Sequence, residues 1–278
     1  MTSSITRTSF TAASLLLSLG LSSPLSAQQT KAPTLGEILQ RVDENLNRYD
    51  SRVPSLFCDE HVVSSHAEPG EREQNTITDS IFRLKRVSIP DHPTTLLESR
   101  EIRLVNGKPP TSQHLQGPAL LSGAFEGALA VVSLNQTACM KYTLQRINRK
   151  HPTQPYIVRF ATVLTPQNSS DCLLQEKSQG RVLIDPASMQ ITRLELSTPH
   201  HTIDNESSYE SPVIGKRDIT VDYAPVLLGG ETFWMPSTIT MHVTTGSGTF
   251  HPSFWSFRAA YRNYHKTEVT SRIQYDGP

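Results

Sequence analysis

Hydrophobic and polar residues alternate along most of this chain, which is the pattern of strands that bury one face. In the clearest stretch, TFWMPSTITMHVTT, one predicted face carries Phe233, Met235, Ser237, Ile239, Met241 and Val243. Pro236 cannot donate to a strand ladder, so we expect an edge position or a bulge there. Similar runs, bounded by turn residues such as Asn106-Gly107 and Asp185-Pro186-Ala187-Ser188, predict about ten antiparallel strands.

Two segments follow a helical period instead. The first begins near Thr34, which forms a capping box with Glu37, and it closes at Pro54. Its apolar residues gather on one side: Leu35, Ile38, Leu39, Val42 and Leu46. The second covers residues 117–133, with Pro118 at the first helical position and Leu121, Phe125, Leu129 and Val132 at helical spacing.

This pattern predicts an α+β fold with a strongly curved antiparallel sheet, a half-open β-barrel, and two helices on its concave side. A flat sheet of about ten strands would leave apolar faces and long edges exposed. If the two helices fill the concave side incompletely, the remainder is a dry cleft suited to an apolar ligand.

The first residues have the order of a secretory signal: Arg7, an apolar run over residues 12–21, then small residues closing at Ala27. We therefore expect a signal peptide at 1–27, one domain at 28–278, and a periplasmic or secreted location. Because the segment before the cut has no cysteine, we expect no lipid anchor. No later stretch is long and uncharged enough to span a bilayer.

Three cysteines remain after the predicted cut: Cys58, Cys139 and Cys172. An oxidising compartment permits one disulfide and leaves one thiol. If the runs 139–147 and 156–164 pair antiparallel, the following turn brings Cys172 within reach of Cys139. We therefore prefer Cys139–Cys172, while the other pairings and three free thiols stay open.

Charge and composition exclude several classes of protein. The chain has 26 basic and 26 acidic side chains and no basic stripe with interleaved aromatic residues, so we expect no nucleic-acid partner. His200 and His201 point to opposite faces of a strand and have no companion at metal-ligand spacing, so we expect no metal site and no cofactor.

Catalytic motifs are not evident either. Ser247 in TGSGT lacks the strand-turn-helix elbow of a serine nucleophile. Alternation places Asp59 and His61 on one strand face and Glu60 on the other, which we interpret as a solvated strand face. A hydrolase would need several titratable groups that converge on one pocket, and the spacing does not indicate this, so we expect no enzymatic activity.

The segment 180–194, of the form G-x-V-x-I-D-P-x-S-x-x-I-T-R-L, and the closing YRNYHK at 261–266 resemble the periplasmic lipoprotein-carrier superfamily with the LolA/LolB-like fold. The resemblance implies a half-open barrel with helices as a lid over an apolar cavity that takes acyl chains. It places the helix at 117–133 about where the lid helices of that family fall.

We therefore expect a non-catalytic binding protein for a lipid, a lipidated protein or another apolar ligand. Because large apolar and adaptable side chains suit such a wall, the candidate ligand-binding residues are Phe125, Leu129, Phe233, Trp234, Met235 and Met241. The alternative is an exported structural or interaction protein whose helices fill the sheet completely and leave no room for a ligand.

Overall fold

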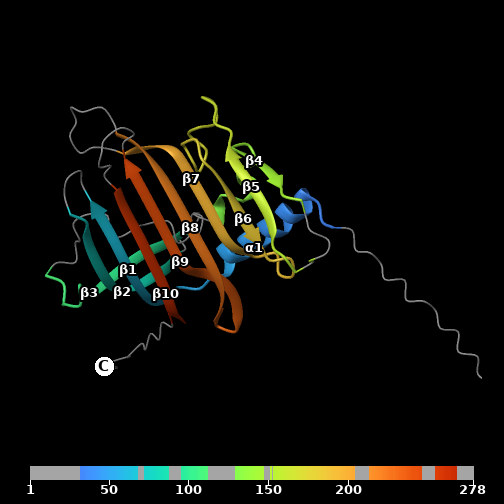
Figure 1. Ribbon diagram of the computed structural model, residues 1–278. Coiled ribbons are helices and arrows are strands. Elements are labelled where there is room, and N and C mark those ends of the chain that lie inside the picture. Colours follow the sequence, from blue (N-terminus) through green and yellow to red (C-terminus); the bar gives the residue numbers. More distant parts are fainter. Residues whose placement is uncertain are drawn as a thin grey trace, which may run out of the picture. The chain divides into compact units, whose positions relative to one another are not determined.

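The computed structural model describes residues 32–67, 72–87, 95–111, 129–146, 151, 153–203, 213–245 and 254–267 (Figure 1). The predicted signal peptide lies outside these ranges and stays a prediction. In chain order the elements are α1 (Leu35–Arg52), β1 (Leu56–Ala67), β2 (Gln74–Val87), β3 (Thr95–Val105), the 3-10 helix η1 (Leu134–Gln136), β4 (Met140–Leu144), β5 (Tyr156–Thr162), β6 (Gln179–Ile184), β7 (Ile191–Ile203), β8 (Val213–Leu228), β9 (Glu231–Thr245) and β10 (Phe254–Lys266).

Helix α1 starts where the sequence predicts. The Thr34 backbone N–H donates to the Glu37 carboxylate at 2.6 Å, and the Glu37 N–H donates to Thr34 Oγ1 at 3.3 Å. These two bonds satisfy donors that have no partner within the helix. The helix ends at Arg52, and its buried residues are Ile38, Leu39, Val42 and Tyr49.

The ten strands form one antiparallel sheet in the order β3-β2-β1-β10-β9-β8-β7-β6-β5-β4. Neighbouring strands follow each other in the sequence, with one exception: β1 and β10, the first and last strands of the chain, pair with each other (Figure 1). Strands β3 and β4 are the two edges and do not pair with each other. The sheet is therefore open, as the half-open barrel prediction requires.

Of the two alternatives expected at Pro236, an edge position or a bulge, the structure has the bulge. Tyr223 pairs with Pro236 and Asp222 pairs with Thr238, so Ser237 is the extra residue on β9. Pro236 thus lies in a central strand without breaking a regular ladder. The bulge resets the alternation, because Met235 and Pro236 are both buried and the next buried residue is Ile239.

The second predicted helix is not confirmed. Residues 112–128, which hold most of it, lie outside the described part of the chain. Of its end, only Leu129 and Ala130 are helical, and the chain then makes a turn and the short η1. Within the described residues the structure therefore has one α-helix where the sequence predicts two. No helix in this part is long and apolar enough to cross a membrane.

Candidate functional site

One face of the sheet, here called the inner face, packs against α1, and a row of side chains that is apolar except for Thr78 crosses it through all ten strands. Each residue of the row is directly paired with the next, and those in the eight central strands are fully buried or nearly so. The row is Leu144, Val158, Val182, Leu194, Val221, Ile239, Ala259, Val62, Thr78 and Val105. Since directly paired residues share a face, the inner face is apolar across almost its whole width.

Helix α1 contacts one end of the strands. The Asn45 side chain donates to the carbonyls of Ser188 and Met189 in the β6–β7 turn, at 3.2 and 2.9 Å. Arg52 pairs with Glu231, the first residue of β9, at 3.1 Å. These polar contacts fix the helix along the turns that join β6 to β7 and β8 to β9 (Figure 1).

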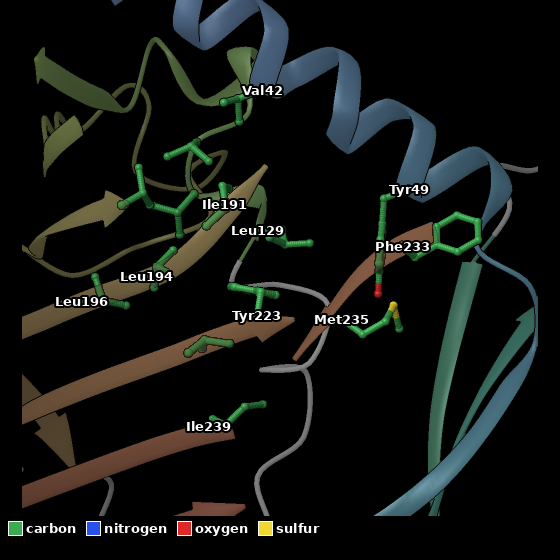
Figure 2. Close-up of a cluster of buried hydrophobic side chains, with 14 of the residues drawn as sticks. Val42, Tyr49, Leu129, Ile191, Leu194, Leu196, Tyr223, Phe233, Met235 and Ile239 are labelled. Carbon is green, nitrogen blue, oxygen red and sulfur yellow. The ribbon is translucent and has the colours of Figure 1, made fainter. Parts of the chain in front are cut away.

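The predicted ligand-binding residues lie in this region, with one exception. Leu129, Phe233, Met235 and Met241 belong to the buried core cluster, and Trp234 is partly buried against it. Figure 2 shows Tyr49 of α1 pointing toward Met235, with Phe233 beside it and Leu129 nearby. Phe125 lies outside the described residues. The burial of these residues does not test a binding role, which stays a prediction.

The same face carries a buried ion pair in strands β1 and β3. Arg100 Nε donates to both carboxylate oxygens of Glu60, at 3.0 and 2.9 Å, and the exposed fractions of the two side chains are 8% and 0%. A second carboxylate, Glu98, lies 3.9 Å from Arg100 Nη1. The Arg100 guanidinium is 4.9 Å from the centre of the Phe82 ring. The pair is thus enclosed by protein on the inner face.

The pKa values of this pair reflect its burial. Burial raises the pKa of the Glu60 carboxyl, and the positive charge and hydrogen bonds of Arg100 act in the opposite direction. Burial lowers the pKa of Arg100, but Glu60, Tyr261 and Glu98 together outweigh this effect, so the pKa of the guanidinium is raised. Arg100 therefore stays charged and holds Glu60 in place.

Two hydroxyl groups near this pair have no hydrogen-bond partner among the described residues. They belong to Thr78 and Ser80 of β2, which are 0% and 4% exposed. Ser80 is paired with Glu60 across the ladder, and Thr78 is paired with Val62. Buried polar groups usually have a partner, so the part of the inner face over β1–β3 has unused hydrogen-bonding capacity.

Sequence reasoning correctly separated residues 59–61 between the two faces but was wrong to call the Glu60 side solvated. Asp59 and His61 are exposed, and Glu60 is buried. The signal was available, because Glu60 is in phase with the apolar Cys58 and Val62 along β1. Its partner Arg100 is 40 residues away in sequence, and only the β1–β2–β3 pairing brings the two charges together.

The cysteines follow the preferred pairing. Cys139 and Cys172 form a disulfide across 33 residues, and Cys58 is a buried free thiol. Burial raises the pKa of Cys58 well above its usual value, which keeps it protonated. A buried thiol of this kind packs as a small apolar side chain rather than acting as a nucleophile.

The histidine pair is divided by a register irregularity in β7. His201 Nδ1 lies 2.9 Å from the Glu176 carboxylate, which also accepts a hydrogen bond from Arg217 at 3.2 Å. Across the described residues no group of three His, Cys, Asp or Glu side chains is placed to hold a metal ion. Asp204 and Ser247 lie outside those residues.

Comparisons with known proteins add little to this picture. No family model matches the sequence, and no curated protein matches it. Among solved structures, a LolA superfamily protein, NE2245 from Nitrosomonas europaea, is similar over 86% of this chain and 96% of its own, with 12% identity and a TM-score of 0.31. This is a distant structural relationship, and both values are too low for any property of that protein to be assigned to this chain.

Proposed function

We propose that this protein binds an apolar ligand, such as the acyl chain of a lipid or of a lipidated polypeptide, on the inner face of its sheet beside α1. It does so without chemistry, in the periplasm or outside the cell. The proposal is carried by the extent of the inner-face row, which crosses ten strands, is apolar except for Thr78, and is wider than the one α-helix of the described residues is long.

The mismatch can be expressed in length. Nine spacings between ten strands, at about 4.8 Å each, make the row about 43 Å long. The 18-residue α1 measures about 27 Å, so even along the row it would cover less than two thirds of the width. The row is buried in this structure, so an acyl chain would bind there by displacing apolar side chains that now cover it.

The chemistry of the inner face is also asymmetric. Strands β5–β9 offer apolar residues, including the adaptable Met235 and Met241, whereas β1–β3 add the Glu60–Arg100 pair. A mostly apolar site with a few polar groups at one end suits an amphiphile. The acyl chain would lie over β5–β9 near Phe233, and the polar head would face the ion pair.

The two tryptophans of the chain provide the test. Trp234 lies near the α1 end of β9, and Trp255 pairs with Val243, nine positions along β9 from Trp234 and about 30 Å away at about 3.3 Å per residue. The matched variants Trp234→Phe and Trp255→Phe each leave one donor for energy transfer to a fluorescent polyene fatty acid. Native mass spectrometry of the freshly purified protein reports any lipid that is carried from the host.

We expect the mature chain to take up the fatty acid, with energy transfer stronger from Trp234, in the Trp255→Phe variant, than from Trp255. Equal transfer from both tryptophans would contradict the site beside α1. A folded protein that carries no lipid and gives no transfer in any variant would remove the proposal and favour the filled structural alternative.

A further inference from the structure

A cavity of about 660 Å³ lies on the opposite face of the sheet, here called the outer face, over strands β4–β8. Its outward side chains come from two neighbouring cross-strand rows. They are Lys141, Thr143, Arg159, Ala161, Gln179, Arg181, Glu195, Ser197, Asp218 and Thr220. The cavity is therefore lined by charged groups, hydroxyls and an amide, in contrast to the apolar inner face.

Two arginines lie directly opposite each other in this cavity. Arg159 of β5 is paired with Arg181 of β6, and like charges in direct cross-strand pairs are destabilising. Arg181 is compensated, because it donates to both oxygens of Glu195 at 2.6 and 3.0 Å. Among the described residues, Arg159 reaches only the amide oxygen of Gln145, at 3.5 Å. This part of the fold thus keeps a repulsive pair of which one member has no counter-charge from the described residues.

Lys141 adds a third cation on the edge strand β4. It is paired with Ala161, which places it diagonal to Arg159 at about 7–8 Å between their backbones. Within the described part of the chain neither Lys141 nor Arg159 has a carboxylate at ion-pair distance. In a chain with no net charge, two uncompensated cations on one cavity wall are a local feature rather than a consequence of composition.

The local charge balance indicates the charge that an anion bound in this cavity would carry. The carboxylates near the cavity are already engaged, since Glu195 also accepts from Arg193 at 2.9 Å and Asp218 pairs with Lys216 at 2.7 Å. Arg193 further pairs with Asp222. The basic side chains of this group number five and the carboxylates three: Lys141, Arg159, Arg181, Arg193 and Lys216 against Glu195, Asp218 and Asp222. The difference is two positive charges, which matches the charge of about −1.5 to −2 on a phosphate monoester at neutral pH.

We propose that this outer cavity binds the phosphate monoester of a hydroxyl-bearing organic molecule. Arg159 and Lys141 hold the phosphate, and the hydroxyls of Thr143, Ser197 and Thr220 with the Gln179 amide contact the remainder. Arginine suits this role because its planar fork donates two parallel hydrogen bonds to phosphate oxygens. The phosphate belongs either to a free sugar phosphate or to a lipid headgroup. This site is separate from the proposed apolar site and does not depend on it.

The test compares two probes on the mature protein: glucose 6-phosphate by isothermal titration calorimetry, and vesicles of phosphatidylcholine with and without phosphatidic acid by sedimentation. The variant Lys141→Gln with Arg159→Gln removes the two free cations. Arg258→Gln is the control, because Arg258 is an exposed cation on the outer face of the sheet. It lies in β10, outside the cavity.

We expect the double variant to bind the phosphate probe at least tenfold more weakly and the control to match the wild type. Without ligand, Arg159→Gln alone should raise the unfolding midpoint, because it removes the like-charge pair. Binding of glucose 6-phosphate assigns the site to free phosphates, and binding of phosphatidic acid vesicles alone assigns it to a headgroup. No binding of either probe, an unchanged affinity in the double variant, or an equal loss in Arg258→Gln would overturn the proposal.

Discussion

Gly180 lies where β6 approaches β7 so closely that a side chain has no room. A Cβ atom at this position would be 2.0 Å from the Glu195 backbone oxygen and 2.5 Å from Cζ of Phe160. Rotation of the Phe160 ring about its own axis leaves Cζ in place, so this buried side chain must change its χ1 angle, and the Glu195 oxygen belongs to the backbone of the neighbouring strand. The backbone must therefore move by about 1 Å before the contact reaches even the shortest separation that proteins tolerate.

We expect Gly180→Ala to lower the free energy of unfolding by about 3 kcal/mol, the upper part of the range for overpacked sites, because the obstructing atom is backbone. For a domain of this size that corresponds to a fall in Tm of about 6–12 °C. The assay is urea unfolding followed by tryptophan fluorescence, with thermal unfolding by circular dichroism as a second measure.

Gly36 provides the matched control for this substitution. It lies in the first turn of α1, and a Cβ added there would meet nothing within 4 Å. Gly36→Ala should therefore stabilise the protein by up to about 1 kcal/mol, because alanine is the better helix former. Replacing glycine by alanine should thus lower the free energy of unfolding at Gly180 and raise it at Gly36. A Gly180→Ala protein within about 0.5 kcal/mol of the wild type would refute the steric reasoning.

Three further predictions concern charges and the disulfide. Replacing only Arg100 by methionine should cost about 3–5 kcal/mol in urea unfolding, because it leaves Glu60 buried without its counter-charge, whereas adding Glu60→Leu should recover most of that loss. The hydrogen bond from Arg181 on β6 holds the pKa of Glu195 below its usual 4.5. A carboxyl whose pKa is lower in the folded than in the unfolded protein stabilises the fold at pH values above its unfolded pKa, and this stabilisation is lost as the pH falls through its folded pKa. Glu195→Gln removes this carboxyl. Unfolding midpoints measured from pH 6 to about pH 3 should therefore fall less steeply for this variant than for the wild type. Reduction of Cys139–Cys172 should lower the free energy of unfolding by about 3–4 kcal/mol, from the entropy of a loop closed across 33 residues, as measured by unfolding with and without reductant.

Each of these has an outcome that contradicts it. A double Glu60→Leu, Arg100→Met protein no more stable than the single Arg100→Met variant would show that the loss does not come from an unpaired charge. Parallel pH curves for the wild type and Glu195→Gln would remove the role assigned to that carboxylate. An unfolding midpoint that ignores reductant would mean that the loop is held by contacts other than the disulfide.

Local features of the fold were predictable because their causes are local. The capping pair Thr34–Glu37 fixes the start of α1 through atoms three residues apart. The turn at Asn106-Gly107 has the positive φ angles that these residues adopt readily. In the 180–196 hairpin, the Asp185 carboxylate accepts hydrogen bonds from the backbone N–H and hydroxyl of Ser188, both at 2.7 Å.

The end of the second predicted helix is the main difference from the prediction that the described residues show. The spacing of Leu129 and Val132 fits a helix, yet the chain turns after Ala130, and Val131 and Val132 are buried in the core. The Val131 carbonyl accepts a hydrogen bond from the Tyr142 hydroxyl at 2.8 Å. A contact to another segment thus binds a carbonyl that a helix would use, and periodicity alone cannot indicate this.

The candidate sites divide in the same way. Alternation along one strand showed which residues face the core, and it placed Phe233, Met235 and Met241 among the apolar positions. It could not show that Glu60 meets Arg100, because that contact depends on which strands are neighbours.

The sequence by itself determined the strands and the start of α1, since each follows from residues close together in the chain, whereas it left open whether Pro236 marks an edge or a bulge and which cysteines pair. Only the tertiary structure decided the pairing of β1 with β10, the buried ion pair, the close approach at Gly180 and the outer cavity with Arg159 opposite Arg181. The physical reason is register. A shift of one residue between two strands leaves every local pattern intact, yet it moves each side chain to the other face and gives it new neighbours.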